Sequence, residues 1–157
     1  HVGPMRPTSR GNIKLKSSSP NDSPAIQFNY MQTDHDLREM REGIKIAREI
    51  FHQKEFDEFR GKEISPGKEV DSEEDLNNFI RSKGDTAYHP SCTCKMGKDD
   101  MSVVDEELKV YGVEGLRVVD ASIMPNIITG NLNASTVMIA EKVSDMLLKS
   151  DLKKTYE

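Results

Sequence analysis

The period of the hydrophobic pattern changes along the chain, and the order of these changes limits the folds that the chain can adopt. Residues 12–17 and 25–31 alternate apolar and polar side chains on either side of a turn cluster, which predicts an antiparallel pair of strands. Apolar residues then recur at helical spacing after Thr33, up to about Gln53, and again after Ser72. Threonine and serine are good helix N-caps, so two amphipathic helices are expected here.

The pattern changes again after Gly84. Residues 86–96 are expected to be extended, and residues 102–125 contain two β-branched runs with a glycine-containing connection, which is typical of a hairpin. A final helix is expected to begin at Asn133 as its N-cap. Its predicted apolar face consists of Val137, Ala140, Val143 and Leu147, flanked by Ile139 and Met146.

Strands, helices, strands and a closing helix follow one another in that order, which favours an α+β fold over a doubly wound parallel sheet. A chain of 157 residues can form one domain with a core, but its hydrophobic share of 35% is lean and it has no tryptophan. The sequence also begins, at His1, like the interior of a protein. We therefore expect a piece of a longer protein, which buries part of its surface against other chain.

Charge and cysteine usage exclude several classes of function. A net charge of −5 without a basic stripe argues against a nucleic-acid partner. No apolar run approaches the roughly 20 residues of a membrane-spanning helix, and no signal peptide opens the sequence. Two neighbouring cysteines do not make a secreted disulfide framework, so a cytoplasmic location is expected.

The segment TAYHPSCTCKMG, residues 86–97, combines His89 with Cys92 and Cys94. Zinc-binding cysteine pairs usually have about two to four intervening residues and belong to a complete ligand set, so no metal is expected where a single residue intervenes. The spacing does not fit a thioredoxin-type redox pair either. Both cysteines are best interpreted as small buried hydrophobes. From the residues alone, His89 can be structural or catalytic.

The segment ITGNLNAST, residues 128–136, places Asn131 and Asn133 beside a glycine and just before the expected helix. A helix N-terminus carries partial positive charge and suits an anionic ligand. The alternative is an ordinary capping loop, which the frequency of asparagine at N-caps favours. The residues alone do not decide between the two.

Three ordered motifs resemble the C-terminal signature of the glucose–methanol–choline (GMC) family of flavin oxidoreductases. They are AYHPSCTCKMG, VVD…VYGVEGLRVVDASIMP and TGNLNASTVMIAEK, and the resemblance covers nearly the whole chain. In this family an N-terminal domain binds FAD on a G-x-G-x-x-G turn, a motif that is not in this sequence. The resemblance therefore implies the C-terminal part of an enzyme, with the FAD-binding domain as its missing partner.

This resemblance also implies an architecture. Residues 1–119 would belong to the substrate-binding domain, as an antiparallel or mixed sheet covered by helices. Residues 120–150 would form a segment that contacts FAD and a helix that packs on the missing domain. Residues 151–157 are expected to be a disordered tail.

Carried over by motif, the resemblance implies roles for individual residues. His89 falls on the catalytic histidine, and Asn131 on a second active-site position that is asparagine in choline-oxidising members. The implied cofactor contacts lie in two segments. Asp120 and Ala121 match the segment beside the ribityl–pyrophosphate part of FAD, and Asn133 and Thr136 match the start of a helix that points at the flavin.

The implied reaction is oxidation of choline to betaine aldehyde, a step of betaine biosynthesis, by hydride transfer to FAD with His89 as acid and base. Two alternatives stay open: an oxidase or dehydrogenase of another alcohol, and an isolated fragment that is only a folding or oligomerisation module without cofactor. A membrane-associated electron acceptor, with the enzyme peripheral at the membrane, and an oligomer are further expectations that the residues do not decide.

Overall fold

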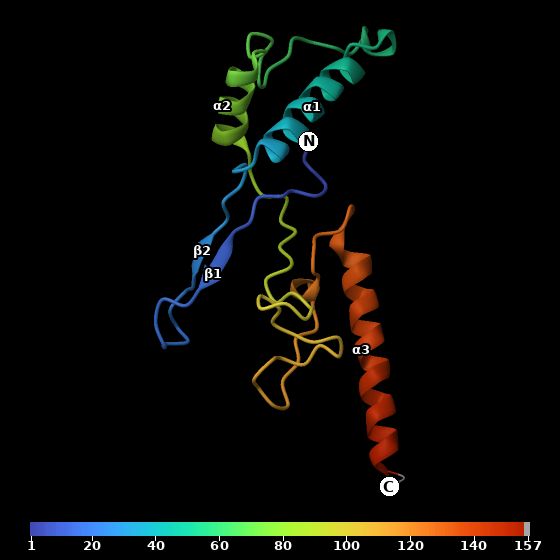
Figure 1. Cartoon of the computed structure of the whole chain (residues 1–157). Coiled ribbons are helices and arrows are strands. Elements are labelled where there is room, and N and C mark those ends of the chain that lie inside the picture. The colour runs from blue at the N-terminus through green and yellow to red at the C-terminus, as the bar shows by residue number, and fades with distance from the viewer. Residues whose placement is uncertain (156–157) are drawn as a thin grey trace. The chain divides into compact units, whose positions relative to one another are not determined.

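The computed structural model describes residues 1–155, with side chains up to residue 149 (Figure 1). It divides into two compact units, His1–Thr86 and Ala87–Glu157, each with its own hydrophobic core. In the described part of the chain, no helix is both long enough and apolar enough to cross a membrane. The division expected between residues 119 and 120 concerns domains of a longer enzyme and stays a prediction.

The first unit contains a short antiparallel sheet of β1 (Asn12–Lys14) and β2 (Ala25–Gln27), with Ile13 opposite Ile26 (Figure 1). The predicted pairing is confirmed. The strands are shorter than the alternating pattern suggested, however, and none of their residues is buried. The alternation of apolar and polar residues therefore predicted the strands correctly, although neither strand has a buried side.

Two α-helices, α1 (Asp34–Phe51) and α2 (Glu73–Lys83), follow in this unit, with the short 3-10 helix η1 (Lys54–Phe56) between them. Both α-helices begin where the caps predict. The hydroxyls of Thr33 and Ser72 each accept a hydrogen bond from the backbone N–H three residues further on. The apolar faces of the helices meet, as the spacing predicts. Their shared core consists of Leu37, Ile44, Leu76 and Ile80.

Asp36, fully buried in the first turn of α1, ties residues 8 and 9 to this helix. One carboxylate oxygen accepts hydrogen bonds from the Thr8 backbone N–H at 2.7 Å and the Thr8 hydroxyl at 3.0 Å, and the other accepts from the Ser9 N–H at 2.9 Å. Burial alone would raise the pKa of Asp36, but the hydrogen bonds from Ser9 and Thr8 outweigh it and lower the pKa from 3.8 to about 2. The carboxylate therefore stays charged inside the unit.

The second unit is built from irregular chain, the short 3-10 helix η2 (Ala121–Ile123) and the long helix α3 (Leu132–Thr155). The expected hairpin is confirmed in part, because Lys109 and Arg117 form an antiparallel bridge. The core of this unit consists of Val104, Leu108, Ile123, Met124, Leu132, Ile139 and Val143.

The expected α+β fold, an antiparallel or mixed sheet covered by helices, is confirmed in part: the described residues form three α-helices and one two-stranded antiparallel sheet of β1 and β2. The β-branched runs of residues 102–125 pair only through isolated bridges. Gly112 and Gly115, with φ of +75° and +74°, turn the chain between Lys109 and Arg117, the partners of one of these bridges.

The start of α3 differs from the prediction by two residues, because an N-cap at Asn133 would make Ala134 the first helical residue. The helix begins at Leu132, so Asn133 lies in its first turn and Asn131 directly precedes it. Asparagine at either position can cap a helix, and sequence does not separate positions this close. The helix continues to Thr155, so the expected tail is helical up to there, and residues 156 and 157 lie outside the described residues.

The predicted apolar face of α3 is confirmed only in part: Val143 and the flanking Ile139 are buried as predicted, and Met146 is half-buried. Leu132, Ile139 and Val143 are buried, whereas Val137 is 53% exposed. Ala140 and Leu147, also assigned to the buried face, are exposed. Apolar residues occur on several sides of this helix, so their spacing alone could not identify the side that meets the core.

We expect Asp36→Asn to lower the free energy of unfolding by about 2 kcal/mol near neutral pH, because a buried carboxylate loses charge-assisted hydrogen bonds. Asp34→Asn is a matched control, since Asp34 is exposed in the same helical turn, and should cost less than about 1 kcal/mol. Denaturant titration followed by circular dichroism measures both. Equal losses would contradict the role given to Asp36.

The same variant should reveal the pH dependence of this contact. The folded-state pKa lies below the ordinary value of 3.8, so the stabilisation is fully present above that value and is lost as the pH falls toward about 2. The difference between wild type and Asp36→Asn should therefore narrow over that interval. If the difference in free energy of unfolding between wild type and Asp36→Asn is as large at a pH of about 2 as at neutral pH, this account is refuted.

Candidate functional site

A row of backbone hydrogen bonds, here called the backbone ladder, joins residues 92–96 to residues 121–123. The donors are the N–H groups of alternate residues and the acceptors are consecutive carbonyls. The bonds run from Cys92 to Ala121, from Cys94 to Ser122 and from Met96 to Ile123, over 3.3, 2.9 and 2.8 Å. The ladder fixes the segment that follows His89 against η2.

A hollow of about 370 Å³ adjoins this ladder. Asp120, Ala121 and Thr136, which are three of the four residues predicted to contact a cofactor, line it. The structure therefore brings these three together from η2 and α3. The other lining residues are Pro90, Ser91, Thr93 and Ser122.

Local capping positions the polar groups of the hollow. The Asp120 carboxylate accepts a hydrogen bond from the Ser122 backbone N–H at 2.7 Å and so caps η2. The Thr136 hydroxyl donates to the Leu132 carbonyl at 2.9 Å, which holds it against α3. Both side chains are therefore oriented by their own elements.

The chemistry of this lining suits a ligand that is rich in hydroxyl groups. An exposed carboxylate at Asp120 repels a phosphate but accepts hydrogen bonds from hydroxyls. The hydroxyls of Ser91, Thr93 and Ser122 can donate or accept. The small side chains, among them Ala121, leave room for a ligand to reach the backbone.

His89 lies directly before Pro90, at the edge of the hollow, and its side chain is exposed. Its Nδ1 lies 2.5 Å from the Ala87 carbonyl oxygen. Asn131 is exposed at the start of α3, and Asn133 is exposed in the first helical turn. Neither asparagine lines the hollow. His89 and Asn131 both belong to the second unit, and their convergence on one substrate atom stays a prediction.

Cys92 and Cys94 were considered as metal ligands, as a redox pair and as small hydrophobic residues, and their surroundings bear on this choice. Both thiols are free, and both cysteines are half-buried, not fully buried as predicted. Cys92 packs against the core of the second unit, as expected for a small hydrophobe. Among the described residues, no group of three or more histidine, cysteine, aspartate or glutamate side chains is placed to hold a metal ion.

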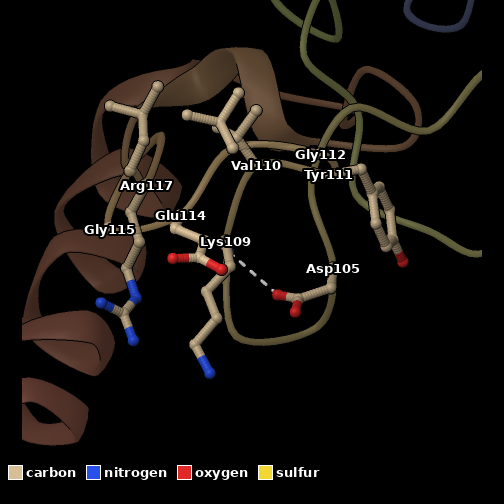
Figure 2. Close-up of a pocket in the computed structure, with 10 residues that line it drawn as sticks. Asp105, Lys109, Val110, Tyr111, Gly112, Glu114, Gly115 and Arg117 are labelled. Atoms are coloured by element: carbon tan, nitrogen blue, oxygen red, sulfur yellow. Dashed lines mark hydrogen bonds between the residues drawn. The ribbon is translucent and has the colours of Figure 1, made fainter.

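A second hollow, also of about 370 Å³, lies within the loop of residues 105–117 and was not predicted (Figure 2). The Asp105 carboxylate accepts a hydrogen bond from the Lys109 backbone N–H at 2.9 Å, drawn as a dashed line in Figure 2. The turn-forming Gly112 and Gly115 are the signal in the sequence that could have indicated this loop. It contains none of the predicted site residues.

Comparison with known proteins relates most of the chain to one family. Residues 7–140 match the C-terminal family described as GMC oxidoreductase. An oxygen-dependent choline dehydrogenase of Acinetobacter baumannii (strain AYE) is 60% identical over 147 residues, which are 94% of this chain and 27% of that protein. This chain thus spans about a quarter of the length of this curated relative.

Two solved structures have the same fold over most of this chain. Pyridoxine 4-oxidase from Mesorbium loti matches with a TM-score of 0.85 and 36% identity, over 90% of this chain and 28% of that one. An FAD-dependent oxidoreductase from Chaetomium thermophilum matches with a TM-score of 0.87 and 30% identity, over 96% of this chain and 26% of that one.

The hollow beside the backbone ladder should depend on the packing of Ile123 of η2 in the core of the second unit. We expect Ile123→Ala to lower the free energy of unfolding by about 2–5 kcal/mol, because its side chain is only 4% exposed and fills this core. Ser122→Ala, at the neighbouring half-buried position, should cost less than about 1 kcal/mol. Denaturant titration compares them, and an Ile123→Ala loss no larger than that of Ser122→Ala would contradict the packing described.

Proposed function

The chain belongs to the GMC oxidoreductase family, and we propose that it forms the C-terminal part of an FAD-dependent choline dehydrogenase that oxidises choline to betaine aldehyde. The observation that carries the proposal is 60% identity to a relative of that name over 94% of this chain. The pyridoxine oxidase is 36% identical, which favours choline over other alcohols. The activity belongs to the longer protein, because this chain spans only about a quarter of that relative.

FAD is the cofactor proposed for the hollow beside the backbone ladder. Asp120, Ser122 and Thr136 supply oxygen atoms that fit the hydroxyl-bearing ribityl chain better than the pyrophosphate, which the Asp120 carboxylate would repel. The N-terminal end of α3, with Asn133, adds partial positive charge. When bound, FAD supplies the acceptor for the hydride that leaves the alcohol carbon.

His89 is proposed to take the proton of the choline hydroxyl. Loss of this proton lets the carbon give up its hydride without leaving a positively charged carbonyl product. The imidazole is exposed, directly before a residue of the hollow, and no other histidine occurs in the second unit. Help of this kind is typically worth about 10²–10⁴ in rate.

Asn131 is proposed to orient the same oxygen. A neutral amide can donate a hydrogen bond to the alcohol oxygen without competing for its proton, and this fixes the direction of the C–H bond. Asn131 directly precedes α3, whose second turn contributes Thr136 to the hollow. The proposal thus assigns proton transfer to His89 and orientation to Asn131.

Dioxygen is the proposed electron acceptor, because the Acinetobacter relative is an oxygen-dependent choline dehydrogenase. A membrane-associated acceptor, an oligomer and a cytoplasmic location stay predictions. So does the expectation that the isolated chain, without an FAD-binding domain, is inactive.

In the longer FAD-loaded protein, His89→Ala should lower kcat for choline by about 10²–10⁴, because the general base is lost. His52→Ala serves as the control, since His52 is exposed at the end of α1, and should keep kcat within about twofold. Absorbance of bound flavin establishes equal cofactor content. Near-normal kcat in loaded His89→Ala would reject the catalytic assignment.

A comparison of substrates tests the proposal that choline is the substrate of the longer protein. We expect kcat/KM for choline to exceed that for aliphatic and aromatic alcohols by at least about tenfold, because this chain is 60% identical to a choline dehydrogenase and 36% identical to a pyridoxine oxidase. Steady-state rates with dioxygen and with an artificial acceptor provide the measurement. If kcat/KM is higher for another alcohol, choline is rejected as the substrate in favour of that alcohol.

A further inference from the structure

We propose that the Ala87 carbonyl, held in place by the left-handed backbone of Tyr88, selects the tautomer of His89 that leaves Nε2 free to accept a proton. This inference rests on the proposed function, because it gives Nε2 its part in the reaction. Tyr88 is thereby a positioning residue, which acts through its backbone conformation on the ring that follows it.

The contact between ring and carbonyl determines where the hydrogen sits. Nδ1 of His89 lies 2.5 Å from the Ala87 oxygen, which can only accept a hydrogen bond. An unprotonated Nδ1 would place two lone pairs against each other at this distance. Nδ1 therefore carries the hydrogen, and in the neutral ring Nε2 then carries the lone pair.

The backbone between donor and acceptor is unusual. Tyr88 has φ of +58°, a conformation that is uncommon for residues other than glycine and asparagine. It turns the carbonyl of the preceding residue back toward the ring of the following one. Cys92, at the other end of the short segment, also has a positive φ, of +71°. Two such residues within five positions indicate a backbone that is held for a purpose.

Contacts with the rest of the second unit fix Cys92, at the C-terminal end of residues 88–92. Cys92 donates its N–H to the Ala121 carbonyl as the first bond of the backbone ladder and packs against the core. Pro90 limits the backbone between Cys92 and His89. The Tyr88 side chain is 78% exposed, so burial of its ring does not account for the strained conformation.

The tautomer matters for the direction of proton transfer. Among the described residues, none is bonded to Nε2 of His89. With its lone pair there, the ring can break the alcohol O–H bond and form an N–H bond; bound FAD would supply the acceptor for the hydride, with its two electrons, that leaves the alcohol carbon. The other tautomer presents an N–H group to the alcohol and cannot accept its proton.

Two variants of Tyr88 separate backbone conformation from the loss of the tyrosine ring. Tyr88→Val and Tyr88→Asn both remove the ring, but asparagine tolerates a positive φ, whereas β-branched valine resists it. In the longer FAD-loaded protein we expect kcat for choline to be at least about tenfold lower for Tyr88→Val than for Tyr88→Asn, with little difference in KM. Flavin absorbance and melting temperature confirm that loaded, folded proteins are compared.

Nitrogen-15 NMR of labelled histidine, with His89→Ala to assign the signal, reads the tautomer directly. At a pH where the ring is neutral, wild type and Tyr88→Asn should carry the hydrogen on Nδ1, and Tyr88→Val should shift population to Nε2. Hydrogen on Nε2 in wild type overturns the proposal, as does equal kcat for the two variants. If Tyr88→Val does not fold, the wild-type spectrum still decides.

The spectrum does not depend on turnover, so a failure of the proposed function remains distinguishable. Wild type with hydrogen on Nδ1 but no choline oxidation would reject the proposed reaction and leave the role of Ala87 in selecting the tautomer intact.

Discussion

The backbone ladder between residues 92–96 and residues 121–123 is the constraint on which the candidate site depends. Its donors and acceptors lie far apart in the sequence, yet the ladder brings the segment after His89 to the polar residues around Asp120. Ile123 anchors the acceptor side, because its side chain is buried while its carbonyl accepts a hydrogen bond. The hollow lies along this junction, so core packing and site geometry are coupled.

The surface of α3 agrees with a chain that belongs to a larger protein. Ile139 and Val143 are buried in the core of the second unit, whereas Val137 and Met138 are 53% and 59% exposed. A helix that is apolar on several sides is normally covered on several sides. The related choline dehydrogenase is much longer than this chain, and the expected packing of this helix on an FAD-binding domain stays a prediction.

Local signals predicted the helices of the first unit well, because a cap and a repeating apolar face lie within a few residues of each other. The start of α1 after Thr33 and of α2 after Ser72 followed directly. Contacts between distant residues could not be predicted in this way. Neither the hydrogen bonds from residues 8 and 9 to Asp36 nor the backbone ladder leaves a periodic pattern in the sequence. The face of α3 was ambiguous for a related reason, since the helix offers more than one apolar side.

The candidate site was identified through resemblance, since one histidine and a few polar residues carry little physical signal by themselves. The structure brings Asp120, Ala121 and Thr136 together at one hollow, a grouping that periodicity could not indicate. The contact of His89 with the Ala87 carbonyl was also invisible in the sequence, because it depends on the unusual φ of Tyr88.

The most direct test is a crystal structure of the longer protein with FAD and an unreactive choline analogue. We predict that Nε2 of His89 and the Asn131 side-chain amide both lie within hydrogen-bond distance, about 2.6–3.2 Å, of the oxygen that stands for the choline hydroxyl. A bound analogue whose oxygen contacts neither side chain, in a protein with FAD in place, would contradict the account.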